Sequence, residues 1–271
     1  MQLSNAEKEQ RERFAGFYQR NQLPVMQRIE RSVCGWDFGG TSWTTQEEAD
    51  AVLGALELKP HQKLLDLGAG SGWPGLYLAA QSGCDLTLVD LPPQGLAIAA
   101  QRAAQEKLTG AVGVLVADAR VLPFGNSAFD AITHSDLLCC LPGEAAVLAE
   151  CRRLLRNGGR MIFSVISVSA GLNELEEARA REIGPLFIAS EASYPQMLRD
   201  TDWKLNHVTD LTEQFSDSAR RFLKYDQENK DEFIKLLGEE VWQWRQNKNA
   251  GLVEAIGEGL IRRELFDASP Q

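Results

Sequence analysis

The residues best suited to chemistry lie in one stretch of the chain, 64–75, with the sequence LLDLGAGSGWPG. The apolar residues around Asp66 predict the end of a buried strand. Gly68, Ala69 and Gly70 follow, and glycines there let the backbone turn sharply and approach a ligand without a Cβ in the way. The stretch therefore predicts a cradle for a small molecule.

The spacing of this motif separates two classes of ligand. A dinucleotide fingerprint needs G-x-G-x-x-G, with the pyrophosphate at a helix N-terminus. Gly68 and Gly70 fit that pattern, but Trp73 stands at the third glycine. Asp66 would repel a pyrophosphate, whereas it suits a ligand with an amino group and a sulfonium. These features favour S-adenosylmethionine, and the stretch resembles the first motif of class I S-adenosylmethionine-dependent methyltransferases, an acid followed by G-x-G-x-G.

A second acid follows at the interval that a nucleotide-binding fold requires. Residues 86–89 predict a strand that ends at Asp90, about 20 residues past the glycines, where such folds place a ribose-binding acid. We expect Asp90 to accept hydrogen bonds from the two ribose hydroxyls. Leu91, in the turn stiffened by two prolines, is expected to face the adenine.

The resemblance extends over residues 42–166 and carries further assignments. In the resembling family, the two residues after the third strand contact adenine through a carboxylate and a backbone N–H. Asp118 and Ala119 occupy these places, after a strand predicted over 112–116. The LPF and FD runs within residues 122–130 are also similar to those of small-molecule methyltransferases.

The candidates near the transferred methyl group come from three places. A fourth strand, 130–133, leads into His134 and Ser135, and ligands of open parallel sheets bind outside the carboxyl ends of the strands. His134 is the best-placed titratable group, although a histidine whose ring packs in the core is the structural alternative. Tyr18 on an N-terminal helix is positioned to reach the pocket, or else belongs to the core or surface. Trp43 lies in a glycine-aromatic loop of the kind that lines pockets.

Five alternating strand–helix units predict an α/β fold, a doubly wound Rossmann-like sheet of seven strands. A turn is expected at 157–159 before strand five, and an antiparallel seventh strand at 260–268 is expected to close the sheet. We expect an N-terminal helical lid segment over 1–45 and a cofactor domain over 46–212 and 259–271. A helical substrate cap, 213–258, is predicted between strands six and seven.

Composition excludes several classes of function. The net charge of -10 argues against a general nucleic-acid binder, which needs a basic surface to replace counterions. Five cysteines without a C-x-x-C pair suggest neither a disulfide framework nor a zinc site, and favour a reduced, cytoplasmic location. The polar start and the lack of a long apolar run predict neither a signal peptide nor a membrane span.

These features predict a methyltransferase that transfers a methyl group from S-adenosylmethionine to nitrogen or oxygen of a small metabolite by direct displacement. The glycine loop, the helical insertion and the final ELFDA strand resemble the branch containing phosphoethanolamine and sarcosine/dimethylglycine methyltransferases. The alternatives are a dinucleotide-dependent oxidoreductase, which Trp73 and Asp66 disfavour, and a non-catalytic S-adenosylmethionine-binding protein. The methyl acceptor, the need for a general base and the oligomeric state are left open.

Overall fold

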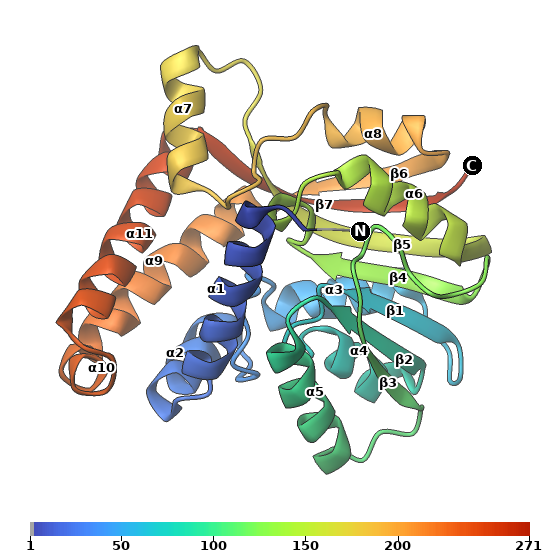
Figure 1. Ribbon diagram of the computed structural model, residues 1–271, viewed down its shortest axis with the longest axis horizontal. Coiled ribbons are helices and arrows are strands. Elements are labelled where there is room, and N and C mark those ends of the chain that lie inside the picture. The colour runs from blue at the N-terminus through green and yellow to red at the C-terminus, as the bar shows by residue number, and fades with distance from the viewer. Residues whose placement is uncertain (1–2) are drawn as a thin grey trace.

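One mixed sheet of seven strands forms the centre of the molecule, which the computed structural model describes over residues 3–271. The strand order is β3-β2-β1-β4-β5-β7-β6 (Figure 1). β1 to β5 run parallel, and β7 runs antiparallel to both of its neighbours. The predicted α/β fold class is confirmed. The strands are β1 Lys63–Leu67, β2 Asp85–Asp90, β3 Val112–Val116, β4 Phe129–Ser135, β5 Leu155–Val168, β6 Trp203–Asp210 and β7 Ile261–Pro270.

Two details of the sheet differ from the prediction. β7 does not close the sheet at its edge, because it lies between β5 and β6 and pairs with both. The turn expected at 157–159 is part of β5 and forms an irregularity in the pairing with β4. Phe129 pairs with Leu155, whereas Ala131 already pairs with Arg160. Gly158 takes a φ of 78° there, which a glycine adopts without strain.

Local sequence signals account for the ends of several helices. Ser4 with Glu7, and Thr45 with Glu48, form capping boxes at the starts of α1 and α3. Pro24 begins α2, at the first helical position that proline favours. The helices are α1 Asn5–Asn21, α2 Pro24–Cys34, α3 Gln46–Leu56, α4 Gly75–Ser82, α5 Pro93–Gln105, α6 Glu144–Leu154, α7 Glu174–Ile183, α8 Tyr194–Asp200, α9 Thr212–Glu228, α10 Lys230–Leu237 and α11 Glu239–Gly257, with a short 3-10 turn at Leu138–Cys140.

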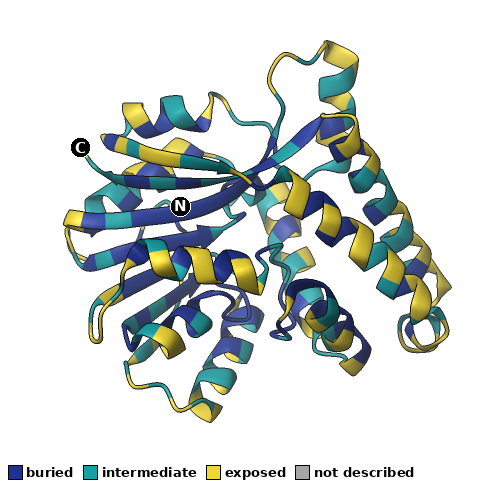
Figure 2. Ribbon diagram, turned by 180° about the vertical axis from the view of Figure 1, so that it is seen from behind, coloured by how far each residue is buried: buried dark blue, intermediate teal, exposed yellow. Residues whose placement is uncertain are grey.

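The sheet buries both of its faces, because successive side chains of a strand alternate between them. Leu65, Ile132 and Phe163 belong to one buried cluster, which includes residues of α6 and α8. Leu64 and Ala131, one position away, belong to the other, which includes residues of α2 to α5. Figure 2 shows the buried residues concentrated along the central strands. The order of side chains along β4 therefore decides which face each residue joins.

The helices that the prediction assigned to lid and cap lie to one side of the sheet. α9, α10 and α11 lie between β6 and β7 in the sequence, as predicted for 213–258. In Figure 1, α1 stands between these helices and the sheet. The first two residues of the predicted 1–45 segment lie outside the described range. Within 3–271, no helix is long and apolar enough to cross a membrane.

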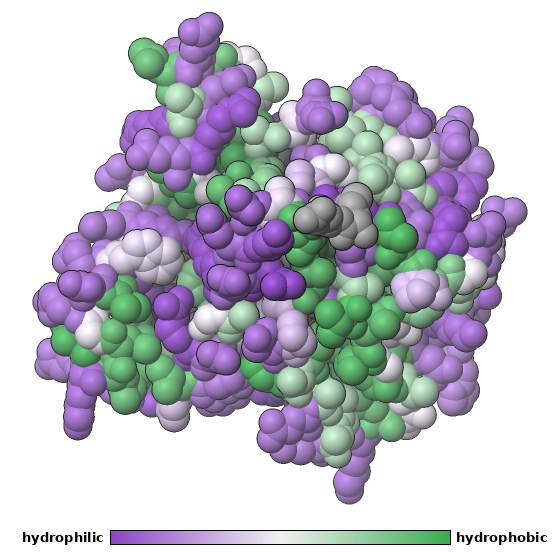
Figure 3. Space-filling model, in the orientation of Figure 1, coloured by the Kyte–Doolittle hydropathy of each residue, from purple (hydrophilic) through white to green (hydrophobic). Residues whose placement is uncertain are grey.

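The edge of the sheet formed by β3 exposes apolar side chains. Val114 and Val116 of β3 are 45% and 53% exposed. Figure 3 shows hydrophobic side chains gathered over this side of the molecule and hydrophilic ones over most of α7.

Candidate active site

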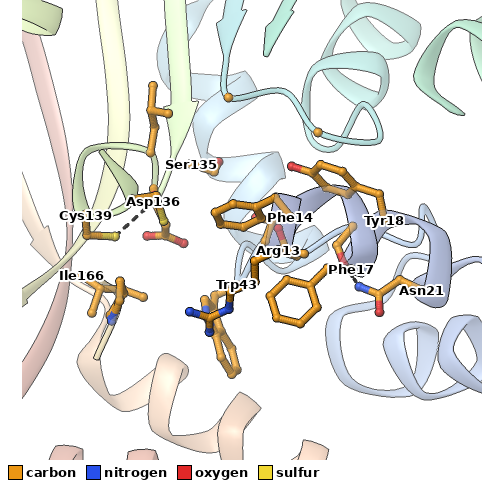
Figure 4. Close-up of a pocket in the computed structure, with 18 of the residues that line it drawn as sticks. Arg13, Phe14, Phe17, Tyr18, Asn21, Trp43, Ser135, Asp136, Cys139 and Ile166 are labelled. Carbon is orange, nitrogen blue, oxygen red and sulfur yellow. Dashed lines mark hydrogen bonds between the residues drawn. The ribbon is translucent and has the colours of Figure 1, made fainter. Parts of the chain in front are cut away.

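A cavity of about 260 Å³ lies where the carboxyl ends of β1, β2 and β4 meet the helical layer. On the side of the sheet, the cavity is lined by residues that the sequence predicts to bind the cofactor: Asp66, Gly68, Ala69, Gly70, Asp90 and Ser135. Tyr18 and Trp43 line it from the N-terminal segment. Figure 4 shows these two side chains on opposite sides of Phe14 and Phe17, with Ser135 and Asp136 across the cavity. Eight of the twelve predicted site residues therefore share one cavity.

The glycine loop follows β1 closely and leaves no room for larger side chains. Gly68 and Gly70 have φ values of 66° and 51°, in the left-handed region that glycine adopts without strain. A Cβ on Gly70 would lie 2.9 Å from the Tyr18 hydroxyl, and one on Gly68 would lie 2.8 Å from Leu137. The glycines are therefore needed both for the turn and for the close approach of α1.

Asp90 joins the loop, the strand end and α1. Its Oδ2 accepts hydrogen bonds from the Gly70 backbone N–H at 2.8 Å and from the Tyr18 hydroxyl at 3.1 Å. Its Oδ1 accepts one from the Leu91 N–H at 2.7 Å. Burial raises the pKa of this carboxyl to about 6, although these hydrogen bonds oppose the shift. A carboxylate oxygen accepts about two hydrogen bonds, so Oδ1 keeps one acceptor position for a ligand hydroxyl.

Asp66 is the least satisfied acid of the cavity. The residue is 1% exposed, and its Oδ2 has no hydrogen-bond partner among residues 3–271. Burial raises the pKa of the carboxyl to about 8; a hydrogen bond from the Gly75 backbone opposes the shift and the charge of nearby Asp90 adds to it. A buried carboxylate oxygen without a hydrogen-bond partner is costly. A ligand ammonium group would satisfy it.

The glycine-aromatic loop after α2 is anchored at both ends. The buried carboxylate of Glu30 accepts hydrogen bonds from the N–H groups of Gly39 at 2.6 Å and Gly40 at 2.9 Å. The indole N–H groups of Trp36 and Trp73 both donate to the Thr44 carbonyl, at 2.7 and 2.8 Å. Trp73, which departs from the dinucleotide pattern, thus ties the glycine motif of β1 to the N-terminal loop.

His134 does not lie in the cavity. It shares the face of β4 that carries Ile132, is fully buried, and its ring stacks on Phe163 at 4.6 Å between centroids. Neither ring nitrogen has a hydrogen-bond partner in the described chain, and burial lowers its pKa to about 3. A neutral histidine that faces the core is not in a position to take a proton from a ligand at the strand end. Its catalytic role, expected from sequence, gains no support from this location.

Three predicted adenine contacts also lie outside the residues that line the cavity: Leu91, Asp118 and Ala119. Asp118 is engaged by Arg120, whose Nε and terminal nitrogen donate to its two oxygens at 2.9 and 2.7 Å. Arg120 also pairs with Glu7 of α1 at 2.6 Å. In this structure the Asp118 carboxylate therefore holds α1 near the sheet through Arg120, and its contact with adenine remains a prediction.

A buried ionic network beneath the cavity was not predicted from sequence. Arg263 of β7 is 0% exposed and contacts Asp136, just after β4, at 3.0 and 3.1 Å and Glu48 of α3 at 2.8 Å. Its guanidinium also donates to the hydroxyls of Thr44 and Ser164. Asp136 takes a positive φ of 53° and lines the cavity. The network therefore fixes the backbone that follows Ser135.

The helical end of the cavity was also missed as a site. Phe14 and Phe17 of α1 belong to no motif of the sequence, yet both line the cavity. Helical periodicity predicts which face is covered but not whether a ligand or the core covers it. Cations from α1 and α11 join the aromatic side chains there. The residues are Arg13, Phe14, Phe17, Phe222, Arg245 and Lys248.

A seven-stranded α/β sheet with an acid–glycine loop at its first strand and a cavity over the strand ends defines the class I methyltransferase fold. Residues 65–163 match the methyltransferase domain family. Over this segment the chain is similar to methyltransferase domains, and its fold is that of solved methyltransferase structures.

Individual proteins resemble the chain at low identity. It is 29% identical to methyltransferase GfsG from Streptomyces halstedii over 163 residues, and the match covers 59% of each protein. It is 29% identical over 197 residues to phosphoethanolamine N-methyltransferase from Triticum aestivum, covering 73% of this chain and 38% of that protein. The chain thus spans about two fifths to three fifths of the length of these relatives.

The fold is shared with a solved phosphoethanolamine methyltransferase. Haemonchus contortus phosphoethanolamine N-methyltransferase 2, in complex with phosphomonomethylethanolamine and S-adenosylhomocysteine, matches with a TM-score of 0.78 at 20% identity. The match covers 95% of this chain and 60% of that one, so the shared architecture includes the helical layer as well as the sheet.

Proposed function

We propose that this protein is an enzyme that transfers the methyl group of S-adenosylmethionine to nitrogen or oxygen of a small metabolite. The observation that carries the proposal is the buried carboxyl of Asp66 beside the glycine loop, whose Oδ2 has no hydrogen-bond partner among residues 3–271. S-adenosylmethionine supplies an ammonium group for that carboxyl and a ribose hydroxyl for the open acceptor position of Asp90. Both acids line the same cavity, so the residues present fit the cofactor.

The bound cofactor supplies a methyl group on a positively charged sulfur, which is already an activated leaving group. The chain then has to align the acceptor with that methyl group and exclude water. Tyr18 is suited to positioning and not to proton abstraction, because burial raises its pKa well above the usual range and its hydroxyl donates to Asp90. We assign it the role of holding α1 over the cofactor.

The helical segments complete this proposal. The N-terminal segment 1–45 acts as a lid over the cofactor, since Tyr18 and Trp43 line the cavity beside the glycine loop. The segment 213–258 acts as the substrate cap, because Phe222 and Arg245 line the far end. Five free cysteines agree with the cytoplasmic location expected from sequence, which stays a prediction.

Calorimetry with S-adenosylhomocysteine and with a nicotinamide dinucleotide tests the cofactor. We expect the first to bind and the second not to bind. Asp90→Ala should weaken S-adenosylhomocysteine by more than about 1 kcal/mol, the scale of a hydrogen bond to a charged group. Asp85→Ala is a matched control, because Asp85 begins the same strand outside the cavity.

Transfer of labelled methyl groups to a panel of amines, acids and phenols tests catalysis. Binding of the nicotinamide cofactor alone would refute the proposal. Tight S-adenosylhomocysteine binding without transfer to any acceptor would favour a non-catalytic binding protein.

A further inference from the structure

The helical end of the cavity concentrates positive charge in an acidic protein. The chain has a net charge of -10. Three cations nevertheless line this end of the cavity: Arg13 of α1, and Arg245 and Lys248 of α11. Figure 4 shows the Arg13 side chain extending from α1 into the cavity on the side of Trp43. Arg245 has an acidic partner, described below, whereas Arg13 and Lys248 have none among residues 3–271.

The acids that line the cavity are engaged elsewhere. Glu30 accepts the two loop N–H groups of Gly39 and Gly40, and Asp136 pairs with Arg263. Asp66 and Asp90 lie beside the glycine loop and are assigned above to the cofactor. Among residues 3–271, neither Arg13 nor Lys248 forms an ion pair. The two cations are therefore available to a ligand.

Arg245 is held in place by a buried partner. Its Nε donates to Oδ2 of Asp226 at 2.5 Å, and the amide of Asn249 donates to the same oxygen at 3.3 Å. Asp226 is 0% exposed, and it lies on α9. Among the described residues, Nε is the only nitrogen of the Arg245 side chain that donates a hydrogen bond. Its two terminal nitrogens remain to form the paired hydrogen bonds with which arginine binds carboxylates and phosphates.

Aromatic side chains pack against Arg13 and Lys248. The Arg13 guanidinium lies 5.3 Å from the centroid of the Phe17 ring, and the Lys248 ammonium lies 5.4 Å from that of Trp244. Burial lowers the pKa of Lys248 to about 8, and the charges of Arg13 and Arg245 add to the shift. Arg13 is exposed and Arg245 is paired with Asp226, so Lys248 is the cation of this group that a bound anion would stabilise most.

We infer that Arg13, Arg245 and Lys248 bind an anionic group of the methyl acceptor, whose apolar body lies along Phe14, Phe17 and Phe222. The acceptor is then a small apolar or aromatic molecule that carries a carboxylate or a phosphate. This inference rests on the proposed function, because it takes the glycine-loop end as the cofactor end. Asp226 is a positioning residue that acts through Arg245.

Calorimetry in the presence of saturating S-adenosylhomocysteine tests the site with phenylacetate, phenyl phosphate and the neutral analogue phenylacetamide. At least one acid should bind about tenfold or more tightly than the amide, as expected for a charged hydrogen bond. The stronger of the two acids identifies carboxylate or phosphate as the preferred group. This comparison uses the wild-type protein and needs no variant to fold.

Substitutions then test which residues contribute to the affinity for the preferred acid. Arg245→Met and Lys248→Met should each weaken the preferred acid about tenfold and leave S-adenosylhomocysteine binding unchanged. Lys235→Met is the control, since Lys235 is an exposed lysine of α10 outside the cavity. It should change neither affinity.

Two results would overturn this inference and leave the proposed function standing. One is that S-adenosylhomocysteine binds but neither acid binds more tightly than the amide. The other is that the Arg245 and Lys248 variants weaken S-adenosylhomocysteine as much as the acid, which would assign the cations to the cofactor carboxylate. If S-adenosylhomocysteine does not bind the wild-type protein, the proposed function fails and this inference fails with it.

Discussion

Asp66 and Asp90 lie in one cavity, and burial raises the pKa of both, yet their surroundings differ. Asp90 is held by three hydrogen bonds from the loop, the next residue and α1, so it is fixed before a ligand arrives. Oδ2 of Asp66 has none. Asp90 is therefore a preformed acceptor, whereas Asp66 is a group whose protonation should respond to the ligand.

Binding of the cofactor product at pH 7 should release protons from Asp66. With a pKa of about 8 the free carboxyl is mostly protonated at that pH, and a ligand ammonium group lowers the pKa by favouring the charged form. The release is measured by calorimetry in buffers of different ionisation enthalpy. Asp66→Asn should abolish it. Equal proton release by wild type and variant would show that another group titrates.

His134 should make folding stability depend on pH. Its pKa in the folded protein is about 3, below the value near 6.5 of an unfolded histidine, so below pH 6.5 only the unfolded state takes the proton. Stability is then lost as pH falls from about 6.5 towards about 3, by at most about 1.4 kcal/mol per pH unit.

Urea unfolding of wild type and His134→Leu between pH 7.5 and about 5 checks this difference. The variant should have the shallower pH dependence, because leucine neither titrates nor leaves ring nitrogens without partners. If the variant loses turnover while its stability keeps the wild-type pH dependence, the catalytic assignment from sequence would be restored.

At the scale of elements, the buried network joins segments that are far apart in the chain. Arg263 on β7 contacts Glu48 on α3 and Asp136 after β4, so one guanidinium fixes the relative positions of three elements. Because Asp136 directly follows Ser135, the same contact sets the course of the backbone at the edge of the cavity. The antiparallel β7 between β5 and β6 is what brings Arg263 to this place.

Arg263→Met should destabilise the fold by about 3–5 kcal/mol, because it leaves two buried carboxylates without their partner. Adding Asp136→Asn should recover part of the loss. Arg262→Met is the matched control, since the Arg262 side chain is 42% exposed and pairs with Glu264. Urea unfolding measures all three variants. An equal loss for Arg262→Met would show that the network has no special role.

At the scale of the whole molecule, the cavity is assembled from the N-terminal helix, the strand ends and the helices before β7. Tyr18 links α1 to Asp90, and Glu7 links it to Arg120 beside Asp118. A ligand bound at the strand ends would therefore lie beside the residues that hold α1 in place.

S-adenosylhomocysteine at about 100 times its dissociation constant should stabilise the protein by about 2.7 kcal/mol. Amide hydrogen exchange should slow in α1 together with the glycine loop, because Asp90 holds both. Tyr18→Phe should reduce the protection of α1 more than that of the loop. Protection confined to the sheet, with α1 unchanged in wild type, would contradict a lid role for this helix.

The sequence by itself determined the strands of the parallel sheet and the glycine-loop end of the cavity. Glycines at left-handed φ values, an acid at a strand end and capping boxes are local requirements, so their residues can be identified without knowing the fold. This is why Asp66, Gly68, Gly70 and Asp90 were found from spacing alone.

The tertiary structure decided everything that depends on direction and on distant contacts. A strand that shifts by one residue changes face, so proximity in sequence to the end of β4 could not tell that His134 faces the core while Ser135 lines the cavity. The partners of Arg263 lie 215 and 127 residues away, and Arg13 meets Lys248 only when α1 packs beside α11. Charges brought together by folding leave no periodic signal in the chain, and those charges line the helical end of the cavity.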